Sequence, residues 1–173
     1  NDTMKKTIYL LDIGDYMPKV KAITLPFIER WAKRIGADIV KITERKWPEY
    51  PVVYEKLQIY ELAKANGSDW NIYVDLDALI HPDFWDITSV MSKDTVLQNG
   101  CDFSPNRANL DLYILRDGRF IGTCNWFTIF SDWCVDLYRP LEDMTLDEAM
   151  ERMTLIQLER ASGQMKTGHL IDD

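Results

Sequence analysis

The sequence holds few residues for a transition-metal site or a disulfide framework. It contains only two histidines, His81 and His169, so a histidine-rich zinc site is excluded. Its three cysteines, Cys101, Cys124 and Cys134, are an odd number and lack paired metal-ligand spacing. That pattern indicates free thiols in a reducing compartment, so we expect a cytoplasmic location.

Positive charge and long apolar runs are also scarce. Lys and Arg total 20 against 28 Asp and Glu, which gives a net charge of −8. Such a chain repels a polyphosphate backbone on average, so we expect no nucleic-acid partner. No apolar run approaches the roughly 20 residues of a membrane span. The N-terminal residues also lack a signal-peptide pattern.

Apolar residues are nevertheless plentiful enough for one hydrophobic core. They make up 46% of the 173 residues, which excludes a disordered or fibrous protein. The sequence contains no internal repeat, low-complexity tract or interdomain linker. We therefore expect a single domain over residues 1–173.

Alternating strand and helix patterns predict an α/β domain. Apolar runs at 7–14 and 37–42 read as strands, and between them helical spacing begins at Pro18 and ends at Gly36. Pro26 should kink this helix or mark the start of its regular part. A strand–helix–strand unit favours a parallel sheet. The remaining expected elements are helices over 53–66, from Pro82, from Ser131 to Tyr138 and over 145–161, and strands over 70–74, near 112–115 and over 126–130.

Two carboxylates follow the predicted strand at 70–74, in the tripeptide Asp75-Leu-Asp77. Ligands of open α/β sheets collect at the carboxyl ends of strands, where this pair should lie. Positions i and i+2 of a strand share a face, so the two side chains are expected to project together. A divalent cation would relieve the repulsion between them. The alternative is an aspartate pair that only caps turns at the strand end.

This region resembles the core of GT-A-fold glycosyltransferases. Tyr54-Glu-Lys-Leu57 precedes the apolar stretch Asp69-Trp-Asn-Ile-Tyr-Val-Asp-Leu-Asp77, as a basic residue and a leucine often precede the DxD motif in glycogenin-like and lipopolysaccharide galactosyltransferase-like families. The resemblance implies a Rossmann-like nucleotide-diphospho-sugar transferase fold, with a mostly parallel central sheet flanked by helices. It also implies a hexosyltransferase that moves a sugar, expected to come from a UDP-sugar, to a glycan or protein-linked acceptor.

The resemblance also implies roles for individual residues. The DxD carboxylates of Asp75 and Asp77 would hold Mn²⁺ or Mg²⁺ against the donor diphosphate, with His169 as a further metal ligand. Asn125 lies near the family's Asn-x-Gly position, although this chain reads Asn-Trp-Phe and lacks the glycine. The residues implied to bind the donor are Asp12, Ile13, Gly14, Asp15, Lys56, Asp75 and Asn125.

The last two residues, Asp172 and Asp173, resemble a later acidic pair near the reacting sugar. An inverting transfer needs a carboxylate base for the acceptor hydroxyl, and either residue could supply it. GT-A domains usually continue beyond such a pair. The domain is therefore a candidate for truncation at its C-terminus.

Several simpler interpretations stay open from the sequence. Lys56 can be a solvated helix residue, and Asp12 and Asp15 can simply close a turn. Trp47 and Tyr50 are candidates for stacking on a ligand, whereas Trp126, Phe127 and Phe130 are expected in the core.

Two other functions also remain possible. One is a haloacid-dehalogenase-like phosphatase, whose late acidic motif is mimicked by Ile171-Asp-Asp173, although Ala78-Leu79 departs from its usual Gly or Thr. The other is a non-catalytic module that binds a nucleotide sugar.

Overall fold

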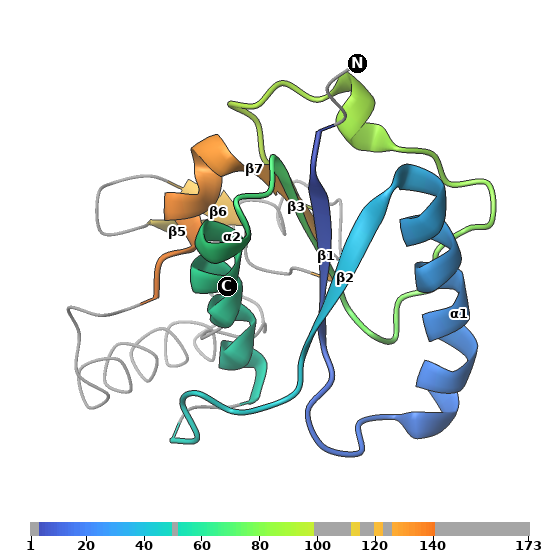
Figure 1. Cartoon of the computed structure of the whole chain (residues 1–173). Helices are drawn as coiled ribbons and strands as arrows, with labels where there is room; N and C mark the ends of the chain where they lie inside the picture. Colours follow the sequence, from blue (N-terminus) through green and yellow to red (C-terminus); the bar gives the residue numbers. More distant parts are fainter. Residues whose placement is uncertain (1–3, 50–51, 99–111, 115–119, 123–125, 141–173) are drawn as a thin grey trace, which may run out of the picture.

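The computed structural model describes residues 4–49, 52–98, 112–114, 120–122 and 126–140. Its strands and helices follow one another in the order shown in Figure 1. The elements are β1 (Lys6–Leu11), α1 (Pro18–Ile35), β2 (Ala37–Ile42), the 3₁₀ helix η1 (Val52–Gln58), α2 (Ile59–Asn66), β3 (Trp70–Val74), the 3₁₀ helix η2 (Ile87–Val90), β4 (Leu97–Gln98), β5 (Leu112–Ile114), β6 (Phe120–Gly122), β7 (Phe127–Ser131) and the 3₁₀ helix η3 (Asp132–Tyr138).

The central sheet has five strands in the order β2-β1-β3-β7-β4. β1 pairs in parallel with both β2 and β3, as the strand–helix–strand pattern predicts. β7 runs antiparallel to β3, and β4 runs antiparallel to β7. The sheet is therefore mixed, and the expectation of a mostly parallel sheet is not confirmed. More than fifty residues separate β3 from β7, and a connection of that length allows either direction of return.

Two hydrophobic clusters cover opposite faces of this sheet. Ile8 and Ile72 point into a first cluster, which is covered by α1 and by the segment after β3. Tyr9 and Tyr73 point into a second cluster, covered by α2 and η3. Neighbouring strand residues face opposite sides of a sheet, so one strand supplies both clusters. The result is an α/β/α arrangement, with α1 on one side of the sheet and α2 on the other (Figure 1).

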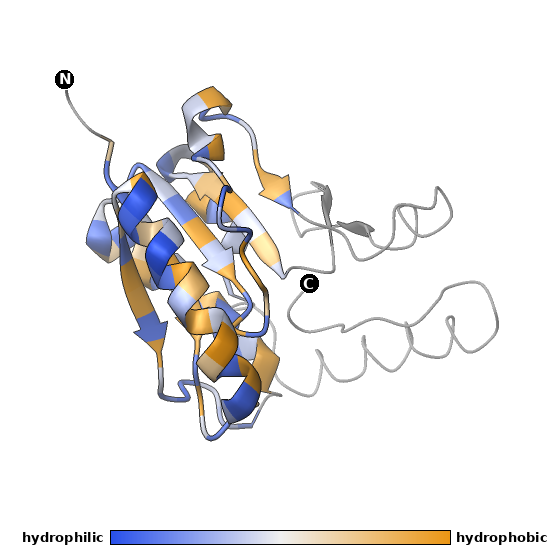
Figure 2. Cartoon of the chain, turned by 90° about the vertical axis from the view of Figure 1, so that its right-hand side faces the viewer, coloured by the Kyte–Doolittle hydropathy of each residue, from blue (hydrophilic) through white to orange (hydrophobic). Residues whose placement is uncertain are grey.

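α1 shows the periodicity on which its prediction rests. Ile28 and Trp31 are buried against the sheet, whereas Ile23 of the expected apolar face is 62% exposed. Hydrophobic and hydrophilic residues accordingly alternate along its turns (Figure 2). Pro26 lies inside the helix, which already begins at Pro18, so it does not mark the start of the regular part. The helix ends where Gly36 adopts φ 70°, a conformation that glycine adopts without steric cost.

The remaining helices differ from their predicted form. The helix expected over 53–66 is divided into η1 and α2. The helix expected from Pro82 is a turn, followed by η2 at Ile87–Val90. Ser131 caps η3 as predicted, because its hydroxyl accepts a hydrogen bond from the Trp133 N–H at 3.1 Å. The expected helix over 145–161 lies outside the described residues.

Candidate functional site

The Asp75-Leu-Asp77 segment forms a turn directly after β3. The Asp75 N–H donates to the Trp126 carbonyl at 2.8 Å, and the Ala78 N–H donates to the Asp75 carbonyl at 3.0 Å. β3 ends at Val74, so the shared strand face that the sequence suggested for the two aspartates does not exist. Asp75 is partly buried and Asp77 is exposed.

Asp75 contacts two side chains that approach it from different elements. The Tyr73 hydroxyl donates a short hydrogen bond to Asp75 Oδ1. The Lys56 ammonium, carried by η1, lies 3.6 Å from the same oxygen. The Lys56 and Asp75 side chains are only 13% and 29% exposed. The structure thus brings together two of the residues singled out in the sequence, and Lys56 is not a freely solvated side chain.

Asp77 meets a residue that the sequence reasoning missed. The Tyr16 hydroxyl, from the loop between β1 and α1, donates to Asp77 Oδ2 at 3.4 Å. Partial burial raises the pKa of Tyr16, and the negative charges of Asp77 and Asp75 raise it further, while Lys56 opposes them. These four side chains therefore lie within electrostatic reach of one another. The signal in the sequence was a tyrosine directly after the Asp12–Asp15 segment.

The Asp12–Asp15 segment leads from β1 toward this group. Asp12 forms an ion pair with Lys21 of α1 at 3.1 Å, and its N–H donates to the Ile42 carbonyl at 2.9 Å. Ile13 packs against the second hydrophobic cluster. Gly14 adopts φ 68° and Asp15 is exposed. Asp12 thus has a structural partner, and a role of this segment in donor binding stays a prediction.

Glu55, next to Lys56 in the chain, is a buried carboxylate that the sequence reasoning also missed. It is 0% exposed and accepts hydrogen bonds from the Lys46 N–H at 2.9 Å, the Trp47 N–H at 2.8 Å and Gln58 Nε2 at 2.6 Å. A buried charge is tolerated when it is satisfied in this way. Glu55 fastens the loop before η1 to η1 itself and so fixes the helix that carries Lys56.

The aromatic candidates divide largely as expected. Phe127 and Phe130 are buried, and Trp126 packs against the first hydrophobic cluster. Trp47 packs edge-on against Tyr54, with their ring centroids 5.1 Å apart. Stacking of a ligand on Trp47 stays a prediction.

Five candidate residues lie outside the part of the chain that the structure describes. They are Tyr50, Asn125, His169, Asp172 and Asp173. Within the described residues, no group of three or more His, Cys, Asp and Glu side chains is placed to hold a metal ion. The described part of the site supplies the carboxylates of Asp75 and Asp77. Hard cations such as Mg²⁺ are commonly bound through one or two carboxylates together with ligand phosphates, so this donor set fits such an ion.

Charge is unevenly placed around this turn. Lys56 lies beside Asp75, whereas exposed Asp77 contacts the neutral Tyr16 phenol. The group can therefore offer an ammonium to an anion and carboxylate oxygens to a cation. A diphosphate accompanied by a divalent ion requires both.

Comparison with known proteins gives a distant likeness to solved structures. No family model and no curated protein matches the chain. Among solved structures, the chain is similar to a glycosyltransferase involved in the glycosylation of the major capsid of PBCV-1, with 12% identity and a TM-score of 0.49. The match covers 78% of this chain and 63% of that protein, so this chain spans less than two thirds of its length. A likeness this distant does not bear on the activity of this chain. Among the residues that the structure describes, no helix combines the length and hydrophobicity needed to cross a bilayer.

Proposed function

We propose that this protein is a metal-dependent glycosyltransferase of the hexosyltransferase type, which moves a sugar from a UDP-sugar donor to a glycan or protein-linked acceptor. One observation carries the proposal. Asp75 and Asp77 follow a buried central strand of an α/β sheet, and the Lys56 ammonium lies 3.6 Å from Asp75. In open α/β sheets, ligands bind outside the carboxyl ends of the parallel strands, which is where these groups lie.

The proposed metal ion is Mn²⁺ or Mg²⁺, held by Asp75 and Asp77 together with donor phosphate oxygens. When bound, such an ion would supply positive charge to neutralise the departing diphosphate. His169 remains a predicted further ligand. A protein of net charge −8 repels an anionic donor, and a bound metal ion would offset that repulsion.

Lys56 acts beside this ion as a fixed positive charge. Sugar transfer from a nucleotide breaks the bond between the anomeric carbon and a phosphate oxygen, and negative charge grows on the diphosphate. An ammonium already held in place stabilises that charge without reorganisation during the reaction. Asp12, Ile13, Gly14 and Asp15 are proposed to contact the nucleoside, and Asn125 the donor.

The acceptor side of the proposal depends on the end of the sequence. If the transfer inverts the anomeric centre, the acceptor hydroxyl must lose its proton to a base as it attacks. Asp172 or Asp173 is the residue proposed for that role. Substitution of each by Asn should lower transfer while leaving donor binding intact.

A panel of nucleotide sugars tests the donor class. Thermal unfolding is followed with UDP-glucose, UDP-galactose and GDP-mannose, each with Mn²⁺ and with EDTA. A ligand present at 100 times its Kd adds about 2.7 kcal/mol to the free energy of unfolding, so binding raises the Tm measurably. We expect a rise with the UDP-sugars that requires Mn²⁺. If none of the nucleotide sugars raised the Tm, the proposal would be contradicted.

Substitution of Asp77 tests the metal site. Asp77→Ala should abolish Mn²⁺-dependent UDP-sugar binding and leave the fold intact, because Asp77 is exposed. Asp83→Ala, at another exposed aspartate after β3, is the matched control and should bind as the unsubstituted protein does. Equal binding by both variants would refute the metal site. Hydrolysis of simple phosphoesters would favour a phosphatase, and donor binding without transfer or hydrolysis a binding module.

A further inference from the structure

Tyr73 lies beside both Lys56 and Asp75 in the candidate site. Tyr73 is the second-last residue of β3 and is 3% exposed. The hydroxyl donates to Asp75 Oδ1, and the Lys56 ammonium lies over the ring at 5.2 Å from its centroid. Lys56 Nζ is also 3.6 Å from Asp75 Oδ1. Tyr73 thus contacts both members of the ion pair.

The position of Tyr73 is fixed by the centre of the sheet. It lies opposite Tyr9 in the parallel pairing with β1 and opposite Thr128 in the antiparallel pairing with β7. Its side chain belongs to the second hydrophobic cluster, under α2 and η3. A ring held by strands on both sides and by helices above cannot readily turn. Its hydroxyl and its face are therefore rigid supports for the groups that they contact.

Lys56 and Asp75, by contrast, need such support. A lysine side chain has four rotatable bonds, and ordering it costs up to about 2 kcal/mol of conformational entropy. Asp75 lies past the end of the strand, in a turn. Partly exposed ion pairs are worth little when their geometry is loose. Tyr73 restricts both partners, because its hydroxyl donates a hydrogen bond to Asp75 and its ring lies beneath the Lys56 ammonium.

We infer that Tyr73 is a positioning residue of the donor site, which holds Asp75 and, through it, directs the Lys56 ammonium toward the donor diphosphate. This inference rests on the proposed function. It assigns Tyr73 no contact with the donor and no step of the reaction. It predicts that the effects of the Tyr73 hydroxyl and of Lys56 on donor binding are not additive, because both contact Asp75 Oδ1.

Tyr9 provides a matched control for the loss of a buried hydroxyl. It is 0% exposed, lies on the same face of the sheet and pairs with Tyr73 in register. Its hydroxyl donates to Asn71 Oδ1 at 2.9 Å and accepts from Asn66 Nδ2 at 3.0 Å, so its contacts belong to the core. Tyr9→Phe and Tyr73→Phe remove the same group from neighbouring positions.

The first experiment is calorimetric titration of the full chain with UDP in the presence of Mn²⁺. Tyr73→Phe should raise the Kd for UDP about tenfold, in line with the loss of a hydrogen bond to a charged group. Tyr9→Phe should change the Kd for UDP less than twofold. It should lower the Tm at least as much as Tyr73→Phe does. If Tyr73→Phe binds UDP as tightly as the unsubstituted protein does, the inference is overturned.

A double-mutant cycle separates positioning from general structural damage. In a Lys56→Met background, Tyr73→Phe should raise the Kd clearly less than tenfold, because the part of its effect that acts through Lys56 is then absent. An equal tenfold loss in both backgrounds would overturn the inference, because the hydroxyl would then act independently of Lys56. If the unsubstituted protein binds no UDP, the proposed function fails and this inference with it. If it binds UDP and the two tyrosine variants behave alike, only the inference fails.

Discussion

The two ends of the parallel strands use charge differently. The amino end, where β1 and β3 begin, and the carboxyl end, where they finish, both carry aspartates and lysines. At the amino end these groups tie elements together. At the carboxyl end Lys21 and Lys56 likewise pair with Asp12 and Asp75, whereas Asp77 is exposed and pairs with no lysine among the described residues.

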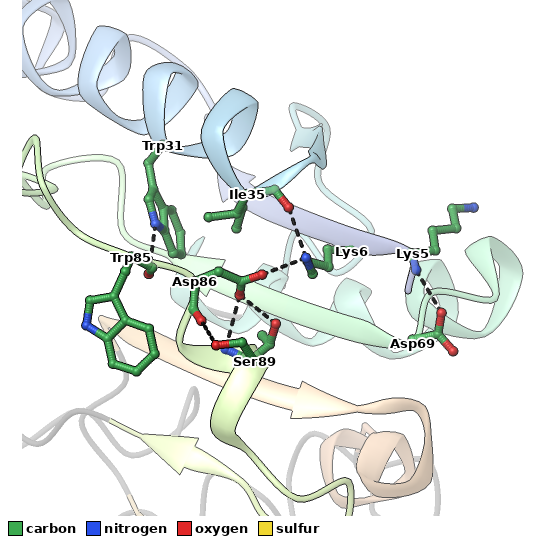
Figure 3. A network of polar contacts seen from close by, with 9 residues as sticks. Lys5, Lys6, Trp31, Ile35, Asp69, Trp85, Asp86 and Ser89 are labelled. Atoms are coloured by element: carbon green, nitrogen blue, oxygen red, sulfur yellow. Dashed lines mark hydrogen bonds and ion pairs between the residues drawn. The ribbon is translucent and has the colours of Figure 1, made fainter. Parts of the chain in front are cut away.

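Asp69 at the amino end is held by a backbone N–H and by a lysine. It accepts a hydrogen bond from the Lys5 N–H at 2.7 Å, and Lys93 approaches it to 3.7 Å (Figure 3 shows the Lys5–Asp69 bond). Lys93 also pairs with Asp132 at 2.5 Å. This ion-pair group links the start of β3 with the end of β7 and with the segment before β4.

Asp86 is held in the same manner on the other side of this end. Lys6 pairs with it at 2.6 Å and donates to the Ile35 carbonyl at 2.9 Å (Figure 3). Asp86 also accepts from the Thr88 N–H at 3.1 Å and so caps η2. The contact joins β1, the end of α1 and η2 in one network.

Asp77 at the carboxyl end has no comparable set of contacts. Among the residues that the structure describes, its one hydrogen bond comes from the Tyr16 phenol at 3.4 Å, a weak contact by its length. Asp75, by contrast, is contacted at Oδ1 by both Lys56 and Tyr73. Fully paired carboxylates stabilise a fold, whereas an exposed aspartate with one weak contact can serve a ligand. The carboxyl end is therefore the end at which to test for ligand binding.

Glu55→Ala tests this contrast most strongly, because Glu55 is a buried and hydrogen-bonded carboxylate beside Lys56. Glu55→Ala removes the acceptor of the Lys46 and Trp47 N–H groups. It also removes one acceptor of Gln58 Nε2, which keeps the Glu44 carbonyl, and the ion pair with Arg45. We expect a loss of about 3 kcal/mol in the free energy of unfolding, measured by urea denaturation. Glu61→Ala removes an exposed partner of Lys46 and should cost less than about 0.5 kcal/mol. Similar losses of stability in both variants would contradict the conclusion that Glu55 holds the loop before η1 in place.

Asp69 tests the amino end directly. Asp69→Ala removes the hydrogen bond from Lys5 and one partner of Lys93, so we expect the free energy of unfolding to fall by about 1 kcal/mol. UDP binding with Mn²⁺ should remain within twofold of the original, measured by calorimetry. The comparison would break if Asp69→Ala weakened UDP binding as Asp77→Ala does.

The smallest effect concerns the pH dependence of the amino-end pairs. A hydrogen bond with Asp132, helped by the charges of Asp132 and Asp69, raises the pKa of Lys93 above its ordinary 10.5. Its contribution to stability is therefore fully present below pH 10.5 and is lost as the pH rises through the folded-state value. Asp132→Asn should cost less than about 0.5 kcal/mol at pH 9, and the cost should shrink at pH 11, in urea denaturation. A cost that grows with pH would contradict this assignment.

Local patterns predicted several elements closely, whereas the helices after β2 differ from their predicted form. The bounds of β2 and β3 follow from apolar runs, and α1 ends at a glycine with positive φ. The direction of β7 could not be predicted, because it depends on how a long connection returns to the sheet. The second predicted helix is divided into η1 and α2, and Glu55 of η1 accepts a hydrogen bond from the Trp47 N–H. Such a tertiary contact can override local helix propensity.

The site was predicted in part. The sequence singled out Lys56, Asp75 and Asp77, and the structure places Lys56 3.6 Å from Asp75, a contact that the sequence did not predict. Tyr73 escaped notice because a tyrosine inside an apolar strand reads as a core residue. Tyr16 escaped notice because it meets Asp77, 61 residues further along the chain, only once β1 and β3 lie side by side.

Calorimetric titration of UDP into the full chain, with Mn²⁺ and then with EDTA, tests the central claim most directly. The account predicts binding with Mn²⁺ and its loss in EDTA, because a carboxylate pair at the carboxyl end of β3 cannot hold a diphosphate without a cation. Binding that is equally tight in EDTA, or absent under both conditions, would contradict it.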